Sequence, residues 1–411
     1  MYVSLRGCGN GTVVFHKIMI IFKESIQMKI IFDRQKLINS IAPLLCAVPN
    51  KGPFPEVECI HMNAEDPAEV VLTTFDLEKA MRVKCEATVL ETGTYAINAN
   101  KLFMMLKVME GDEVTLTVNA KLETTLQSGR STQKMSALKP EGFPAIPAIN
   151  NQSLRYDISC ALLKKMIAKV SFAMGVNDQR YILNGAYFRV EKDSLMVVAC
   201  DGFKMAKCTT KADIVNRSAD DTQVRYSYIV PAKTVQELYR MLPDGEDDRV
   251  MMHMSRKYLI CYFENKTFYT RLIEGEYIDY DRIILKNHKI FVEVDRDRLL
   301  GALERAAVVT EEKIAGSNRT PLRFSPEGDV LKIMANSSAG SSYEEIEIKH
   351  EGEDLLVSLN NKFLIDAIRS CECERLRIEM TSVFSSINII PLDLEEGSDE
   401  VFFLLPIKTK H

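Results

Sequence analysis

The chain has 411 residues, of which 46% are hydrophobic and 27% charged, which is ordinary for a soluble globular protein of about two to four domains. No run of about 18 uninterrupted apolar residues occurs, which excludes a membrane-spanning helix of the usual kind. The formal net charge is −5, so any surface that binds a polyanion must be local rather than general.

The cysteines indicate a reducing environment. Ten are present without a Cys-x-x-Cys pair, and Cys371 and Cys373 are too close together for ordinary zinc-ligand spacing. We therefore expect reduced structural thiols in a cytoplasmic protein, with no metal and no cofactor.

Residues 1–27 stand apart from the rest of the chain. Their apolar stretch, residues 12–22, is interrupted by His16 and Lys17 and is not followed by a small-residue cleavage site, so it is a poor signal peptide. We expect a poorly ordered N-terminal extension. Because this segment holds three basic residues and one acidic residue, the remainder of the chain is more acidic than the whole.

The next segment, residues 28–152, has the pattern of an α+β domain. Alternating apolar residues predict a strand over 28–33, and Leu37, Ile41 and Leu44 predict a helix over 35–45. A second helix is predicted over 101–109, before Gly111. Further strands are predicted over residues 57–62, 70–75, 81–88, 94–97, 114–119, 121–127 and 134–138. The proline-rich residues 139–149 indicate a linker.

This pattern is repeated twice. An extended run that ends in a small polar step with Lys101 has counterparts at Lys233 and Lys362, about 130 residues apart. Such a period is too long for a solenoid, whose units span ~20–50 residues, and fits a whole domain. We therefore predict three tandem domains, residues 28–152, 153–284 and 285–411, each with two helices packed on antiparallel sheets. In the second domain, Asp201-Gly202 between strands 195–200 and 203–208 predicts a tight hairpin.

Basic residues recur on the predicted helices, whereas acidic residues concentrate in loops such as 245–248 and 394–396. Lys233 and Arg240, like Lys362 and Arg369, are seven residues apart and so lie on one stripe of a helix. A solvated face explains any single helix, but a shared bias of six helices favours a surface for a polyanion. The basic residues of the first and second helices are Arg34, Lys36, Lys101, Lys107, Lys164, Lys165, Lys169, Lys233, Arg240, Arg296, Arg298, Arg305, Lys362 and Arg369.

No catalytic pattern is present. The sequence lacks GxxxxGK[ST], GxGxxG, HExxH and GxSxG, and its acidic doublets Asp247-Asp248 and Glu395-Glu396 stand in polar contexts typical of solvated loops. We therefore expect a protein without enzymatic activity. A metal-dependent nuclease is the alternative from another class, and it would require a cluster of Asp, Glu and His.

Two runs carry a specific resemblance: Gln179-Arg180-Tyr181-Ile182-Leu183-Asn184-Gly185 and Cys200-Asp201-Gly202-Phe203-Lys204-Met205-Ala206. Together with matches at residues 128–131, 272–280, 304–307 and 404–408, they resemble the bacterial DNA polymerase III beta subunit family, the replicative sliding clamps. The resemblance extends from Met28 to the C-terminus.

The resemblance implies that each chain forms half of a closed ring. Two chains would join head to tail as a homodimer, with helices lining a hole that encircles double-stranded DNA and slides along it without sequence specificity. The ring would confer processivity by tethering the DNA polymerase III catalytic subunit, the clamp loader complex and other clamp-binding proteins. The alternative within the family is a paralogous clamp specialised for repair or an accessory role.

The resemblance also implies three sets of site residues. The peptide-binding pocket would comprise Leu183, Gly202, Phe203, Lys204, Met205, Arg282, Ile283, Phe384, Ser386, Leu405, Pro406 and Ile407. The dimer contacts would comprise Lys101, Leu102, Met135, Val308 and Val309. DNA contacts would comprise Lys51, Gln179, Arg180 and Tyr181, and the basic helices add Lys164, Lys169, Lys233, Arg240, Arg298, Lys362 and Arg369.

Some positions depart from the family pattern. Phe203 stands where His is frequent, Lys204 where Arg is frequent, and Ile278 where Pro is usual. These departures leave the peptide preference of the pocket open.

Overall fold

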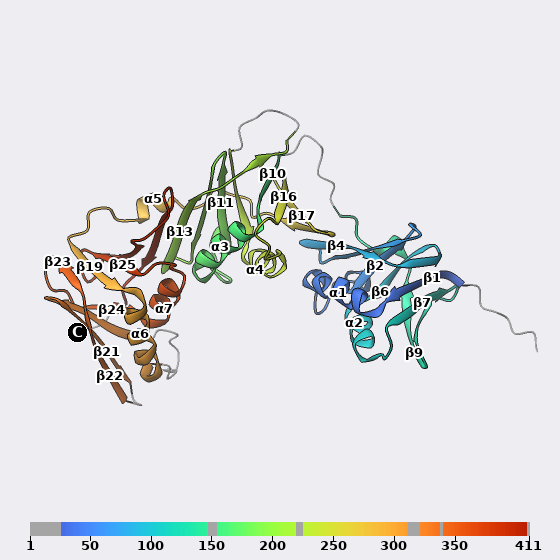
Figure 1. The fold of residues 1–411 in the computed structure, drawn as a ribbon, viewed down its shortest axis with the longest axis horizontal. Helices are drawn as coiled ribbons and strands as arrows, with labels where there is room; N and C mark the ends of the chain where they lie inside the picture. The colour runs from blue at the N-terminus through green and yellow to red at the C-terminus, as the bar shows by residue number, and fades with distance from the viewer. Residues whose placement is uncertain (1–25, 147–153, 219–224, 311–320, 338–339, 409–411) are drawn as a thin grey trace, which may run out of the picture.

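The computed structural model describes residues 26–146, 154–218, 225–310, 321–337 and 340–408, which form three similar units arranged as an arch (Figure 1). Most of the expected N-terminal extension, residues 1–25, lies outside the described residues, but Ile26 and Gln27 already belong to the first strand. In the proline-rich segment, Pro140–Gly142 form a 3₁₀ turn, and residues 147–149 lie outside the described part.

The first unit contains the two predicted helices and nine strands, one more than predicted, because β5 is a separate strand after β4. Its elements are β1 (Ile26–Asp33), α1 (Arg34–Leu44), β2 (Cys59–Ala64), β3 (Glu69–Phe75), β4 (Lys79–Glu86), β5 (Thr88–Glu91), β6 (Gly93–Asn98), α2 (Ala99–Val108), β7 (Glu113–Asn119), β8 (Glu123–Ser128) and β9 (Ser131–Leu138). The strand expected over 57–62 starts later, because Pro55 begins a 3₁₀ turn that lasts to Glu58.

The second unit repeats this order. Its elements are β10 (Leu154–Ser159), α3 (Cys160–Val170), β11 (Gly185–Glu191), β12 (Ser194–Cys200), β13 (Lys204–Lys211), β14 (Val215–Asn216), β15 (Arg225–Pro231), α4 (Ala232–Met241), β16 (Arg249–Met254), β17 (Tyr258–Phe263) and β18 (Lys266–Arg271). A connector, residues 272–289, which includes the short helix α5 (Tyr280–Ile283), leads to the third unit.

The third unit has the same order again. Its elements are β19 (Ile290–Asp295), α6 (Arg296–Thr310), β20 (Pro321–Glu327), β21 (Val330–Ser337), β22 (Gly340–Glu347), β23 (Lys349–Glu351), β24 (Val357–Asn360), α7 (Asn361–Arg369), β25 (Arg375–Met380), β26 (Ile387–Pro391) and β27 (Asp399–Leu404). The prediction of three α+β units, each with two principal helices, is confirmed.

The polar step seen in the repeated sequence is the N-cap of five of the six principal helices, whereas α4 follows Pro231, which forms no side-chain cap. Asp33 accepts a hydrogen bond from the amide of Lys36 (2.8 Å), and Asn98 accepts one from the amide of Lys101 (3.0 Å). Ser159, Asp295 and Asn360 do the same for α3, α6 and α7. Each cap satisfies a backbone donor that has no partner within the helix, and so fixes where the strand ends and the helix begins.

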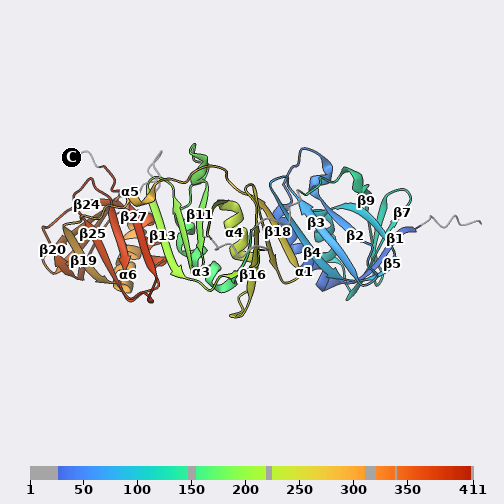
Figure 2. The ribbon, with the colours of Figure 1, turned by 90° about the horizontal axis from the view of Figure 1, so that it is seen from above.

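The sheets run across the boundaries between units. β4 of the first unit pairs with β18 of the second, within a sheet of 14 strands. β13 of the second unit pairs with β27 of the third, within a sheet of nine strands, and β20, β21, β22 and β24 form a separate sheet. The outer layer therefore joins the three units through main-chain hydrogen bonds (Figure 2).

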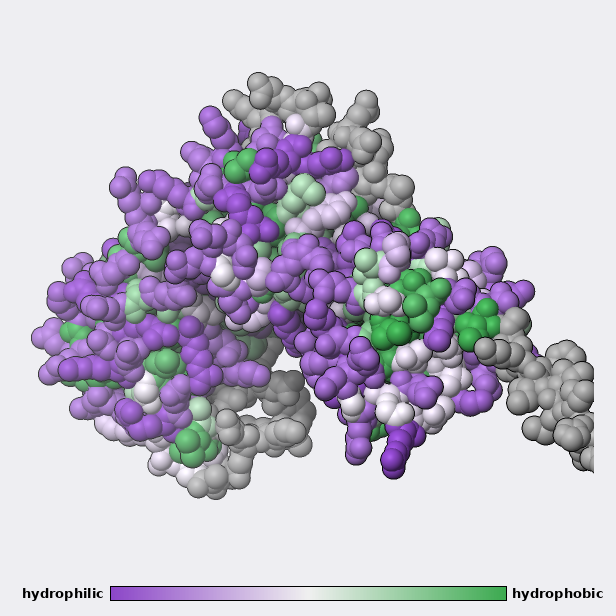
Figure 3. Space-filling view, turned by 45° about the vertical axis from the view of Figure 1, so that its right-hand side comes forward, coloured by the Kyte–Doolittle hydropathy of each residue, from purple (hydrophilic) through white to green (hydrophobic). Residues whose placement is uncertain are grey.

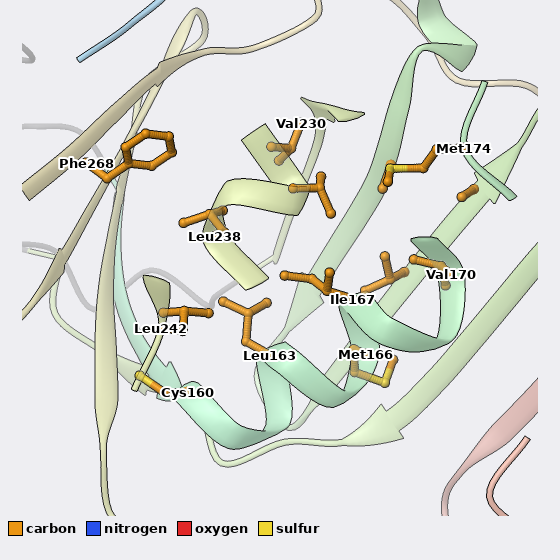
Figure 4. Close-up of a cluster of buried hydrophobic side chains, with 14 of the residues drawn as sticks. Cys160, Leu163, Met166, Ile167, Val170, Met174, Val230, Leu238, Leu242 and Phe268 are labelled. Atoms are coloured by element: carbon orange, nitrogen blue, oxygen red, sulfur yellow. The ribbon is translucent and has the colours of Figure 1, made fainter. Parts of the chain in front are cut away.

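The helices lie on the concave side of the arch and the sheets on its outside (Figure 1). In the second unit, Leu163 and Ile167 of α3 face Leu238 of α4, with Val230 and Phe268 from the strands completing the contact (Figure 4). Burial of each such large apolar side chain contributes roughly 1.5–3 kcal/mol. This packing turns the outer faces of six helices toward the space enclosed by the arch.

Candidate functional site

Two cations on the second helices of their units are well placed to meet a large polyanion. Lys233 on α4 and Lys362 on α7 are both exposed on helices of the concave side. Arg240 and Arg369, about two turns further along the same helices, are 67% and 57% exposed and bind nearby glutamates. The helical spacing in the sequence therefore correctly predicted that these four cations lie on exposed helix faces.

The glutamate partners limit the strength of this surface. Arg369 binds Glu304 at 2.7 Å, and Arg298 on α6 binds Glu347 at 3.4 Å. Because these pairs are exposed, each contributes little and is readily broken or screened by salt.

Lys169 is not part of the basic surface, and the prediction that it contacts DNA is wrong. Its side chain is 5% exposed and forms an ion pair with Glu400 of β27, which is also 5% exposed. Burial by itself lowers the pKa of the Lys169 ammonium, but the carboxylates of Glu400 and Glu372 outweigh this effect and raise it. Lys169 therefore ties α3 of the second unit to the third unit.

Three of the basic residues on the first helices hold the end of the neighbouring helix. Arg34 donates to the carbonyl of Leu106 (3.1 Å), Lys164 to that of Leu242 (3.2 Å) and Arg296 to that of Ile368 (3.2 Å). The C-terminal carbonyls of a helix lack partners within the helix and carry partial negative charge, which a cation compensates. Lys164, only 17% exposed and also paired with Asp244, is therefore mainly structural, contrary to its prediction as a DNA contact.

The loop contacts inferred from the resemblance are mostly exposed. Lys51 and Gln179 lie at the surface and Tyr181 is 61% exposed. Arg180 is exposed too, but it binds Asp178 at 2.9 Å and donates to the carbonyl of Asp201 at 3.3 Å. This guanidinium lowers the pKa of Asp178 through its hydrogen bond and also holds the loop against the following hairpin.

The exposed part of the predicted pocket comes from three separate segments. Phe203 from the β12–β13 turn, Phe384 from the β25–β26 loop and Leu405 after β27 are 49%, 72% and 37% exposed. The amide of Leu405 donates to the carbonyl of Phe203 (2.9 Å), so the turn and the C-terminal segment are adjacent. Pro406 and Ile407 follow, partly exposed. Three large apolar side chains exposed at the junction of two units form a surface suited to a short peptide.

Other residues assigned to the pocket lie beneath its surface. Leu183 and Met205 have no exposure and pack with Phe403 in a buried cluster, which the partly exposed Ile283 joins from the connector. Ser386 is also buried, at 5% exposure. The prediction that these buried side chains face a peptide is wrong for the described structure; they support the surface from below. Arg282, at 87% exposure, lies on the connector and binds Asp279 at 3.0 Å.

A tight hairpin is present but lies one residue later than predicted: the amide of Asp201 donates to the carbonyl of Lys204, so Gly202 and Phe203 form the turn. Gly202 has φ +87°, a backbone conformation in which other residues are strained, and a Cβ there would come within 2.5 Å of an Arg180 guanidinium nitrogen. Lys204 is 8% exposed, binds Asp201 at 2.5 Å and lies 4.2 Å from the centre of the Phe363 ring on α7. It is therefore held between the second and third units and does not face the pocket.

Two of the predicted dimer residues are internal. Leu102 is fully buried and Met135 is 5% exposed, so the prediction that they contact another chain is wrong. Both point into the core of the first unit. Lys101 is exposed, Val308 on α6 is 78% exposed, and Val309 is partly exposed.

Two exposed apolar residues on α2 were not predicted as part of any site. Met104 and Val108 are 61% and 72% exposed, and Figure 3 shows apolar side chains gathered on the first unit. Their signal was available, because they recur four residues apart on the face opposite the buried Leu102 and Leu106. Exposed apolar residues at helical spacing indicate a surface that another molecule covers.

Within the described ranges, no group of three or more His, Cys, Asp or Glu side chains is placed to hold a metal ion. The helices of the same ranges include none that is long and apolar enough to cross a membrane.

Comparison with known proteins identifies the family. The N-terminal, central and C-terminal domain descriptions of the DNA polymerase III beta subunit match residues 28–147, 157–279 and 281–400. The chain belongs to the DNA polymerase III beta subunit family. The resemblance found in the sequence is thereby confirmed, and membership makes the chain a non-catalytic DNA sliding clamp of replication.

Individual beta subunits are similar along their whole length. The beta sliding clamp of Staphylococcus aureus is 25% identical over 393 residues, which cover 93% of this chain and all of that protein. The clamp of Chlamydia muridarum is 24% identical over 381 residues, covering 93% and 99%. Among solved structures, the Bacillus subtilis clamp has a TM-score of 0.85 at 24% identity, and that of Pseudomonas aeruginosa 0.83 at 26%; each covers 93% of this chain and 100% of the other.

Proposed function

We propose that two copies of this chain close into a ring around double-stranded DNA and tether the replicative polymerase to it. The observation that supports the proposal most directly is the strand pairing at the two junctions between units. In both, the third strand after the first helix of one unit pairs with the last strand of the next unit, as β4 with β18 and β13 with β27.

The same strand pairing, extended to the two ends of the chain, requires a second copy of the chain. The strand equivalent to β4 and β13 in the third unit is β22, which pairs only with β21 and is an edge of its sheet. The strand equivalent to β18 and β27 in the first unit is β9, which pairs with β8 and meets β6 only through its last two residues. The free edge of β22 from one chain and that of β9 from another therefore complement each other, head to tail.

Side chains support the same contact. β22 presents Glu345 and Glu347, both exposed, whereas Arg130 and Lys134 flank or belong to β9. At the junction of the second and third units, the first helix α3 meets the end of the second helix α7 through Lys165 and Glu372, 2.9 Å apart. By the same rule, α6 with Val308 would meet the partner chain's α2, whose exposed apolar residues it would cover.

A ring of this kind places the helices inside. Lys233, Arg240, Lys362 and Arg369 would then face the duplex, with Lys51 and residues 179–181 at the rim. Contacts to phosphates carry no sequence information, and weak, screened contacts allow sliding. Retention on DNA would come from the closed ring rather than from affinity.

The pocket supports the tethering role. Its exposed apolar surface, formed by Phe203, Phe384 and Leu405, is suited to short peptides of the polymerase III catalytic subunit, the clamp loader and other clamp-binding proteins. The proposal includes the division of the chain into residues 28–152, 153–284 and 285–411, and a location in the cytoplasm, where replication proteins with reduced cysteines are found.

The test is retention on DNA of different topology. After loading onto a nicked circle, the clamp is expected to remain bound during gel filtration at high salt, and to be released when a restriction enzyme linearises the circle. Equal retention on both forms, or immediate loss from both, would refute encirclement.

A further inference from the structure

The second unit contains a groove that the sites above do not use. It has a volume of about 1160 Å³ and is lined mainly by residues 225–229 of β15, residues 254–256 at the end of β16 and in the turn after it, and residues 272–278 and Tyr280 of the connector. We name it the edge groove. It runs along one side of β15, which is one of the two edge strands of the nine-stranded sheet.

The backbone of β15 is open toward this groove. The carbonyl of Ile229 points away from β11, because it accepts a hydrogen bond from the amide of Ile273 (3.0 Å). Backbone groups of alternate residues point to the same side of an antiparallel strand, so those of Ser227 and Arg225 point the same way. Within the described residues, these two outward N–H groups and two carbonyls have no hydrogen-bond partner.

The chain covers the equivalent edges in its other two units. β6 is met by Ala137 and Leu138 of β9, and β24 is met by the C-terminal segment, where the amide of Ile407 donates to the carbonyl of Ser358 (2.8 Å). In both cases the occupant is extended polypeptide. At β15 only the single Ile273 contact is made, so residues 225–228 remain open.

The edge groove adjoins the buried cluster that lies beneath the predicted peptide pocket. Ile278 and Tyr280 of the connector line the groove and also pack against the buried cluster that supports the pocket. Tyr187 stacks on Tyr277 with ring centres 5.2 Å apart, which adds an aromatic wall on the same side. A chain that leaves the pocket over the connector therefore reaches the open edge of β15.

We propose that the edge groove is a second docking site, in which an extended segment of the same partner, next to its pocket-bound peptide, adds a strand to β15. The unpaired backbone groups of Ser227 and Arg225 specify a polypeptide backbone, since main-chain hydrogen bonds provide affinity in strand addition. This inference rests on the proposed peptide-binding function of the pocket.

Proline at Ser227 provides a test that keeps the sheet intact. Ser227→Pro removes one outward N–H and obstructs strand addition, while the bonds between β15 and β11 do not use that group, so the edge strand tolerates proline. Ser227→Ala is the matched control, because it keeps the N–H. The probes are overlapping synthetic peptides that tile the polymerase III catalytic subunit of the same cell, measured by fluorescence polarisation.

We expect that a peptide spanning the pocket motif and its flank binds about tenfold more weakly to Ser227→Pro than to the wild type and equally well to Ser227→Ala. Hydrogen exchange of the wild-type chain gives a second measurement that requires no variant: the amides of Ser227 and Arg225 should gain protection when that peptide binds.

Three results would overturn the inference. If Leu405→Ala/Ile407→Ala abolishes binding but Ser227→Pro and the two amides show no effect, the edge groove is not used although the pocket is. If neither variant changes binding, the pocket function itself fails. If the two amides are protected in the free chain and lose protection when residues 1–25 are deleted, the chain's own N-terminal segment is the occupant.

Discussion

The buried ion pair between Lys169 of α3 and Glu400 of β27 gives the sharpest stability prediction. Both side chains are 5% exposed, and the second carboxylate oxygen of Glu400 has no hydrogen-bond partner in the described part of the chain. Lys169→Met keeps most of the volume but leaves the Glu400 carboxylate buried without its main cation. The expected loss of unfolding free energy is about 3–5 kcal/mol, the cost of breaking a buried pair by removing one partner.

Lys165→Met is the matched control on the same helix. Lys165 is 44% exposed and binds Glu372 at 2.9 Å, so this exposed pair contributes at most about 1 kcal/mol. The double variant Lys169→Met/Glu400→Leu removes both buried charges and is expected to recover most of the loss. Urea unfolding measures the free energy of unfolding of all three variants, which can be compared through their midpoints as long as the dependence on urea concentration has the same slope.

The pH dependence follows from the raised pKa of Lys169. A cation whose pKa is higher in the folded state contributes its full stabilisation below the unfolded value, about 10.4, and loses it as pH rises through the folded pKa. The difference between the wild type and Lys169→Met should therefore stay constant from neutral pH to about pH 9. The reasoning is refuted if Lys169→Met costs less than the Lys165→Met control, or if the double variant is no more stable than Lys169→Met.

Other surfaces give four further predictions. Val308→Asp should shift the chain from dimer to monomer in sedimentation, because it places a charge in the proposed contact with α2, whereas Val176→Asp, also highly exposed, should not. Leu405→Ala/Ile407→Ala should weaken the binding of polymerase-derived peptides, since burial of such a side chain contributes roughly 1.5–3 kcal/mol. Leu90→Ala, at another exposed apolar residue, should leave the peptide affinity unchanged. Lys233→Glu and Lys362→Glu should each flatten the salt dependence of DNA binding by about one unit of slope, with the exposed Lys192→Glu as control; an unchanged slope would contradict the inner-face assignment. Gly202→Ala should lower the thermal unfolding midpoint, because alanine is strained at φ +87° and its Cβ meets the Arg180 guanidinium.

The sequence by itself determined the architecture. The period of about 130 residues and the alternating apolar runs predicted three units and their class, and the polar step before most of the helices predicted where those helices begin, because these are local properties of the chain. Asn98 and Asn360 show why: each cap acts within three residues of its own position. The family motifs around Arg180 and Gly202 were also read directly from the chain.

Only the tertiary structure decided which of the site residues reach the surface. Lys165 and Lys169 are four residues apart on one helix, yet the first is 44% exposed and the second is buried against Glu400, more than two hundred residues away. On α2, Leu102 is likewise buried although Met104, two residues later, is exposed. Helical spacing fixes the direction of a side chain, but what lies in that direction depends on which strands and units pack there, and this information is not local.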